Sequence, residues 1–87
     1  MKVKFTKEFE KQLGRAPEKI RKIFGLKLGI FVLDKFSPLL KNHGLSGNLR
    51  GFRSINITGD WQAIFEEISE KDIVMFRSIG THSQLYK

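Results

Sequence analysis

The sequence predicts one small α+β domain over residues 1–87, because helical and strand patterns lie in different halves of the chain. The first half places apolar residues at helical spacing, and the second half holds short strand-forming runs separated by turn residues. Apolar residues make up 40% of the chain and include eight Phe, which is enough for one hydrophobic core. We therefore expect the order β-α-α-β-β-β, with an N-terminal helical hairpin packed on one face of a small antiparallel sheet.

The first half is predicted to hold a short strand and two helices. Val3 and Phe5 alternate with lysines, which is typical of a half-exposed strand. Thr6 is suited to be the N-cap of a first helix, and Gly14 is expected to end it. Pro17 is suited to the first turn of a second, longer helix that runs antiparallel to the first. The apolar face expected for that helix consists of Ile20, Ile23, Phe24, Ile30, Phe31 and Leu33.

The second half is predicted to form three antiparallel strands joined by tight turns. A loop over residues 41–48 precedes them, since Asn, Gly and Ser are concentrated there. The strands are expected over residues 49–57, 61–68 and 73–79. The helices need to bury their apolar stripe against one sheet face, so we expect a functional site on the opposite, open face.

The net charge of +7 is unevenly distributed and favours a polyanionic partner. Residues 1–50 contain twelve Lys/Arg and four Asp/Glu, whereas residues 51–87 contain four and five. A basic half of this kind is typical of proteins that bind nucleic acid, and an acidic protein partner fits it equally well. We expect nucleic acid, above all RNA, as the substrate or partner, although charge alone does not separate the two alternatives.

The composition argues against several other kinds of site. The chain has no Cys, so neither disulfides nor thiolate metal sites are expected, and a cytoplasmic location fits. No apolar run is long enough for a signal peptide or a membrane span, the longest covering residues 28–33. The two histidines lack closely spaced metal ligands, and neither a phosphate-binding loop nor a nucleophile elbow occurs. We therefore expect no metal, no small-molecule cofactor and no membrane partner.

Two histidines and one aspartate are the candidate catalytic groups. His43 lies in the loop before the first strand of the second half, Asp60 lies in a turn, and His82 follows the last strand. Metal-free RNA cleavage needs a base for the ribose 2′-hydroxyl, an acid for the leaving 5′-oxygen, and donors that stabilise the charged phosphorane. Histidine suits the first two roles because it titrates near neutral pH. The alternative is that both histidines are surface residues and that Asp60 only stabilises its turn.

Strand alternation distributes the polar residues of segment 49–57 over two faces. Arg53 shares one face with Ile55 and Ile57, whereas Asn56 shares the other with Ser54. Arg53 is a candidate phosphate ligand because a guanidinium matches a phosphate in charge and geometry. A structural ion pair is the alternative role for this arginine.

Four segments occur in an order and spacing that belong together. They are NHGLSG at 42–47, GFRSINI at 51–57, GDWQAIF at 59–65 and GTHSQLY at 80–86. With these segments and the helical hairpin before them, the whole chain resembles the RelE/ParE superfamily of bacterial toxins, in particular its YafQ-like branch. The resemblance implies a RelE-like fold, in which helices cover one side of a small antiparallel sheet and a cleft lies on the other.

The resemblance also implies a ribosome-dependent mRNA endonuclease that is silenced by a cognate antitoxin. His43, Asp60 and His82 fall on active-site residues of YafQ-like toxins, and Tyr86 falls on a terminal aromatic residue of the site. Asp60 and His43 are then the candidate bases, and His82 is the candidate acid. The implied partners are the antitoxin, the ribosome and mRNA.

Three positions depart from the pattern of the family. Asn56 falls where the YafQ-like branch carries a further histidine, Gln62 where several RelE-type members carry an arginine that contacts the phosphate, and Ser78 where an arginine lies near the site. Asn56 and Gln62 are therefore expected to bind substrate, with Lys41 or Arg53 supplying positive charge. Two alternatives stay open: a ParE-like inhibitor of DNA gyrase that cleaves no RNA, which the paired histidines argue against, and a weakened remnant that only binds antitoxin.

Overall fold

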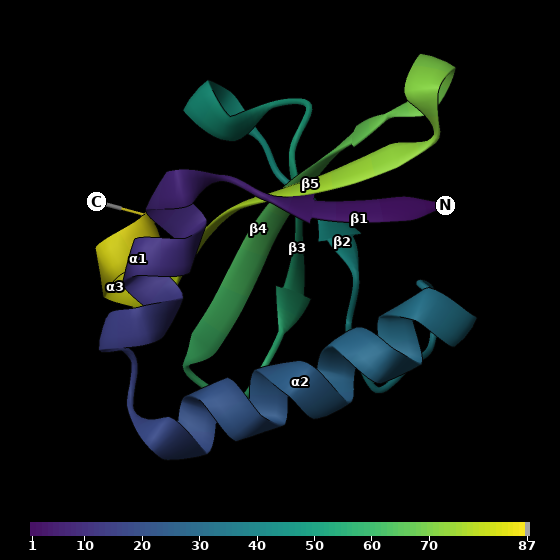
Figure 1. Cartoon of the computed structure of the whole chain (residues 1–87). Coiled ribbons are helices and arrows are strands. Elements are labelled where there is room, and N and C mark those ends of the chain that lie inside the picture. Colours follow the sequence, from purple (N-terminus) through teal and green to yellow (C-terminus); the bar gives the residue numbers. More distant parts are fainter. Residues whose placement is uncertain (87) are drawn as a thin grey trace.

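The computed structural model describes residues 1–86 and contains a five-stranded sheet with strand order β1-β5-β4-β3-β2 (Figure 1). Along the chain the elements are β1 (Lys2–Phe5), α1 (Lys7–Arg15), α2 (Glu18–Leu33), β2 (His43–Gly44), β3 (Arg53–Asn56), β4 (Trp61–Ile68), β5 (Ile73–Thr81) and α3 (His82–Leu85). Short 3-10 turns at Gly47–Leu49 and Ser69–Lys71 precede β3 and β5. The predicted α+β class is confirmed. Within residues 1–86, no helix is both long and apolar enough to cross a membrane.

The sheet is mixed, whereas the sequence predicted a wholly antiparallel one. The pairs β2–β3, β3–β4 and β4–β5 are antiparallel, as short connections between consecutive strands require. β1 instead runs parallel to β5, with Phe5 beside Phe76. The sequence between β1 and β5 contains α1, α2 and the other three strands, so no hairpin determines the direction of β1.

α1 begins where it was predicted to begin but ends one residue later. The Thr6 side chain accepts a hydrogen bond of 3.1 Å from the Phe9 amide, which confirms Thr6 as the N-cap. Gly14 lies inside α1 and was wrongly expected to end it, because the helix continues to Arg15. Glycine lowers helix stability by only about 1 kcal/mol, which the packing of Phe9 in the core outweighs.

The two helices form the predicted N-terminal hairpin, but its arms are splayed rather than antiparallel. In Figure 1, α1 and α2 meet at a wide angle, and α2 alone extends across the sheet. α2 begins at Glu18, so Pro17 precedes its first turn instead of lying in it. The link at residues 16–17 is too short and too extended to fold α2 back along α1.

α1 covers the edge of β5 beyond the point where β1 ends. The Thr6 amide donates to the Phe76 carbonyl at 3.1 Å, and the Ile79 amide donates to Gln12 Oε1 at 2.9 Å. The Gln12 side chain therefore provides the acceptor that a neighbouring strand would otherwise supply.

Replacing Gln12 by alanine is expected to lower the free energy of unfolding by about 1–2 kcal/mol, because the part-buried Ile79 amide loses its acceptor. Hydrogen exchange of the Ile79 amide should accelerate in the variant, and urea unfolding would give the stability. Lys11→Ala, on the exposed side of the same helix, is the control and should leave both quantities unchanged. Equal protection of Ile79 in the variant and wild type would contradict this role of Gln12.

Aromatic packing dominates the core between the helices and the sheet. Neighbouring phenylalanine rings have centroids 5.2 to 6.3 Å apart in a cluster of Phe5, Phe9, Phe24, Phe31, Phe65 and Phe76. α2 contributes Phe24 and Phe31 to this core. Leu33 was predicted to lie on the same face, and this prediction is wrong, because its side chain is 90% exposed. Leu33 is the last residue of the helix and lies outside the hydrophobic core.

Exposed apolar side chains gather on one segment, which we call the 26–39 surface. It consists of Leu26, Val32, Leu33, Phe36 and Leu39, each more than half exposed. Gly25 and Gly29 lie on the same helix, and no other part of residues 1–86 approaches within 4 Å of the position that a Cβ would take at either. The surface is thus apolar and uncovered.

The second half follows the predicted meander with corrected strand ends. β4 covers the predicted residues 61–68, and β5 runs two residues past the predicted end at Ile79. β3 is only four residues long, because a 3-10 turn and Gly51, with φ +96°, bend the chain before Arg53. Two elements were not predicted at all: β2, in the expected loop, and α3.

Candidate active site

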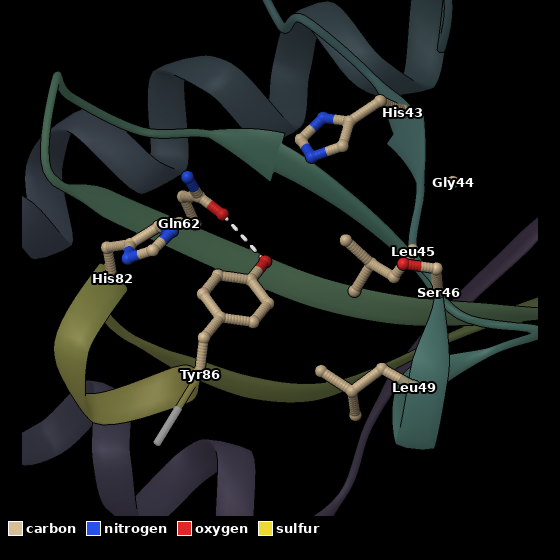
Figure 2. A pocket seen from close by; sticks show the side chains of 8 residues that line it. All are labelled: His43, Gly44, Leu45, Ser46, Leu49, Gln62, His82 and Tyr86. Carbon is tan, nitrogen blue, oxygen red and sulfur yellow. Dashed lines mark hydrogen bonds between the residues drawn. The ribbon is translucent and has the colours of Figure 1, made fainter.

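A cleft of about 310 Å³ opens on the face of the sheet opposite α2. Ile55, Ala63 and Phe65 face the helices and are buried in the core, so the alternate residues Ser54 and Gln62 face the other way. The cleft is lined by His43, Gly44, Leu45, Ser46, Leu49, Gln62, His82 and Tyr86 (Figure 2). Four predicted site residues, His43, Gln62, His82 and Tyr86, are thus brought together from distant parts of the chain.

His43 is oriented by the residue two positions before it. The His43 Nδ1 atom lies 2.8 Å from the carbonyl oxygen of Lys41, a residue with a positive φ of 49°. A carbonyl only accepts hydrogen bonds, so Nδ1 carries the hydrogen and Nε2 of the neutral ring keeps its lone pair. Figure 2 shows Nε2 pointing into the cleft. The ring therefore presents a nitrogen without a hydrogen, Nε2, to the cleft.

His82 is held at the other side of the cleft by α3. A capping box starts this helix, in which the Thr81 side chain accepts from the Gln84 amide and Gln84 Oε1 accepts from the Thr81 amide at 2.8 Å. The His82 amide donates to the Asp60 carbonyl at 3.0 Å, which ties α3 to the β3–β4 turn. The imidazole lies against Tyr86, with ring centroids 4.7 Å apart. The ring itself is exposed and accessible to a substrate.

Gln62 lies between the histidines and accepts two hydrogen bonds. Its Oε1 atom receives the Ser54 hydroxyl at 3.0 Å and the Tyr86 hydroxyl at 2.8 Å (Figure 2 draws the second bond). Ser54 is 0% exposed, and among residues 1–86 it is the only polar residue that is buried. These bonds tie the last helix to the centre of the sheet through one side chain.

Asp60 and Asn56 lie near the cleft but not in its lining. Asp60 is exposed in the turn before β4 and holds His82 through its backbone carbonyl. Asn56 pairs with Gln62 across β3 and β4 and donates its backbone amide to Leu40. No hydrogen bond within residues 1–86 joins either side chain to a histidine.

Arg53 and Lys41 bring no charge into the cleft. The Arg53 Nε atom donates to Asn42 Oδ1 at 2.8 Å, and its guanidinium lies 5.6 Å from the centre of the Phe36 ring, on the other side of β2. The hydrogen-bond partner of Arg53 is thus an amide. The structural ion pair, which was the alternative role predicted for this arginine, is also absent within residues 1–86. Lys41 acts through its backbone carbonyl. In the described part of the chain, therefore, no Lys, Arg, Asp or Glu lines the cleft.

Sequence reasoning missed part of this site. Leu45, Ser46 and Leu49 line the cleft although they were assigned to a loop and a strand. Ser54 was placed on the correct face but not connected with Gln62. The available signal was a lone serine between Arg53 and a buried isoleucine, since a serine buried at such a position needs a polar partner.

Comparison with known proteins gives one family and several similar structures. Residues 1–87 match the family described as the bacterial toxin of type II toxin–antitoxin system, YafQ. The crystal structure of YafQ from E. coli strain BL21(DE3) is similar, with a TM-score of 0.82 and 17% identity over 98% of this chain and 97% of that one. At these identities the structural likeness shows the fold alone.

Two further structures are similar in the same way. One is the E. coli DinJ–YafQ toxin–antitoxin complex, with a TM-score of 0.79, 18% identity and coverage of 98% and 96%. The other is a YoeB/ParE toxin from Agrobacterium tumefaciens, with a TM-score of 0.78, 16% identity and coverage of 94% and 99%. Among proteins with curated functions, none matches the sequence.

Proposed function

The chain belongs to the YafQ family of bacterial toxins of type II toxin–antitoxin systems, and we propose that it is a ribosome-dependent endonuclease that cleaves mRNA without a metal. The observation that supports this proposal is the placement of two histidines, His43 and His82, in the lining of one cleft. The basic excess of residues 1–50 supports contact with ribosomal RNA phosphates, an attraction that weakens as salt rises.

In the proposed reaction, His43 Nε2 takes the proton of the ribose 2′-hydroxyl. The resulting oxygen attacks the adjacent phosphorus, the bond from phosphorus to the 5′-oxygen breaks, and the protonated His82 ring gives its proton to that leaving oxygen. The products are a 2′,3′-cyclic phosphate and a free 5′-hydroxyl, so protons and bonds balance. Tyr86 packs against the His82 ring and limits its orientation.

The test is induced expression in a bacterial host with primer extension on a reporter message, in the presence and absence of its start codon. We expect cuts at positions in register with the reading frame, and we expect them only when the message is translated. Growth arrest with intact message and broken DNA would replace this proposal by gyrase inhibition. The absence of both growth arrest and cuts would indicate a remnant that only binds its antitoxin.

An antitoxin is the protein partner that we propose for this toxin, and the 26–39 surface is where we expect it to bind. The DinJ–YafQ structure is a toxin–antitoxin complex of a similar fold. Apolar side chains here are uncovered, and residues 19–41 carry six Lys/Arg against one Asp. An amphipathic segment rich in Asp and Glu complements both properties.

Leu33→Glu is expected to weaken the complex with the antitoxin at least about tenfold, because it places a negative charge on the apolar surface that faces an acidic partner. Binding would be measured by calorimetry with the product of the neighbouring reading frame. Gly14→Glu introduces the same charge at an open position of α1 and should bind like wild type. Equal affinity of both variants would place the antitoxin elsewhere.

A further inference from the structure

α3 supplies two residues of the cleft lining, although it is only four residues long. His82 is the first residue of the helix, Tyr86 follows its last residue, and both rings line the cleft (Figure 2). A helix of four residues is not stable by itself, because forming a first helical turn is unfavourable. The positions of both rings therefore depend on what holds α3 against the sheet.

Gly80, the residue before the N-cap Thr81, is buried in β5 next to the start of α3. Its φ is not positive, so its backbone conformation does not require a glycine, but the space around it does. A Cβ atom at Gly80 would lie 2.9 Å from Gln84 Oε1, which is closer than van der Waals contact. It would also lie 3.4 Å from Gln84 Cβ and 3.4 Å from Leu85 Cδ2. Within residues 1–86, no other glycine has so close a neighbour.

The atom nearest to this missing Cβ is the one that completes the capping box. Gln84 Oε1 accepts from the Thr81 amide at 2.8 Å, so moving it away from Gly80 would break this hydrogen bond. The residue before an N-cap often carries an apolar side chain that packs against the fourth helical residue. That fourth residue is Leu85, and here it approaches the bare backbone of β5 instead. A side chain at position 80 would thus push α3 away from the sheet.

We propose that Gly80 is a positioning residue for message cleavage, because its missing side chain lets α3 lie close against β5 and so places the His82 ring in the cleft. This role rests on the proposed function, in which His82 gives its proton to the leaving oxygen. Gly80 itself lies outside the cleft lining. It pairs across the sheet with Gln62, to which Tyr86 is bonded at 2.8 Å, so a shift of α3 at this point would displace both rings.

Gly80→Ala is expected to slow single-turnover cleavage on programmed ribosomes about 10- to 100-fold, while the affinity for the ribosome stays unchanged. Gly59→Ala is the matched control and should cut like wild type. Gly59 lies in the turn before β4, its φ is not positive, and its added Cβ would meet no atom within 4 Å. Circular dichroism at the assay temperature would verify that both variants are folded. Cleavage by Gly80→Ala at the wild-type rate would overturn the proposal.

Gln84→Ala loosens α3 without any added atom at position 80. The Gln84 side chain is exposed, so this variant should fold normally, yet it should cut roughly tenfold more slowly because the Thr81 amide loses its acceptor. Adding Gly80→Ala to Gln84→Ala should lower the rate by no more than about twofold, because the nearest atom is gone. Wild-type cleavage by Gln84→Ala, or a further loss of the full size in the double variant, would overturn the proposal.

The His82→Ala background separates a role in placing His82 from a general structural role. In this background Gly80→Ala should have no further effect on the cleavage rate, because Gly80 acts through the histidine ring. A further loss as large as in the wild-type background would show that Gly80 acts elsewhere and would overturn its assignment.

Nuclear magnetic resonance tests the placement of the ring independently of cleavage. The Tyr86 ring, with its centroid 4.7 Å from that of His82, should shield the His82 ring protons. Gly80→Ala should move these signals toward those of a free histidine, and Gly59→Ala should not. Unmoved signals in Gly80→Ala would overturn the proposal for Gly80 while wild-type cleavage still stood. Moved signals, in a protein whose wild type cuts no message, would uphold the placement of the ring by Gly80 and overturn the nuclease.

Discussion

His82→Ala is expected to lower the rate of message cleavage by about 10²–10⁴-fold and to abolish growth arrest, because the leaving 5′-oxygen loses its proton donor. His82 is suited to this role because α3 holds its backbone against the Asp60 carbonyl while the ring stays accessible. Folding should be unaffected, since the ring is exposed and its amide bond to Asp60 does not depend on the side chain.

The measurement is primer extension combined with single-turnover rates on programmed ribosomes. Ser83→Ala, at the next position of α3 and outside the cleft lining, is the matched control and should cut like wild type. His43→Ala should cut as poorly as His82→Ala, in this case because the base is missing. Unchanged cleavage by both histidine variants would remove the proposed mechanism.

Phe76→Ala is expected to lower the free energy of unfolding by about 3–5 kcal/mol, the usual result of deleting a buried aromatic ring. Phe76 is 0% exposed, and its ring packs against five others, at 5.8 Å from Phe5, 5.6 Å from Phe9, 5.7 Å from Phe24, 5.6 Å from Phe31 and 5.3 Å from Phe65. The full stability of such a domain is roughly 5–15 kcal/mol, so the variant should be largely unfolded at 37 °C if the domain lies at the lower end.

Urea unfolding at 25 °C would measure this change, with Phe76→Leu as a milder variant that keeps part of the volume. Phe36→Ala is the control, because Phe36 is 59% exposed and surface substitutions usually change stability by no more than about 0.5 kcal/mol. Similar losses for Phe76→Ala and Phe36→Ala would contradict the assignment of the core.

Regular patterns in the sequence predicted most of the fold. The strand-forming run at residues 61–68, bounded by turn residues on both sides, predicted β4 with the correct ends. Thr6 was confirmed as a cap, since its side chain accepts the hydrogen bond of the Phe9 amide. β2 could not be predicted, since its two residues form a strand only by pairing with β3. α3 had a local signal, the Thr81–Gln84 capping box, but four residues are too few for a helical periodicity.

The candidate site could be predicted only as a list of residue types. The resemblance placed His43, Gln62, His82 and Tyr86, and the structure brings these four together. Strand alternation put Arg53 on the face of Ile55 and Ile57, which is the helix side, yet its charge still suggested a phosphate ligand. Side-chain partners such as Asn42 depend on how the loop at 34–42 packs, which no local pattern encodes.

The same strands carry the core on one face and the cleft on the other, and this arrangement bears on how such a toxin diverges. Along β3 and β4, a change at Ser54 or Gln62 alters the chemistry of the cleft, whereas the neighbouring Ile55 and Ala63 keep the helices in place. Selection can therefore act on odd and even positions separately. A lineage could exchange its catalytic groups one at a time, while the scaffold drifts to 17% identity without losing its shape.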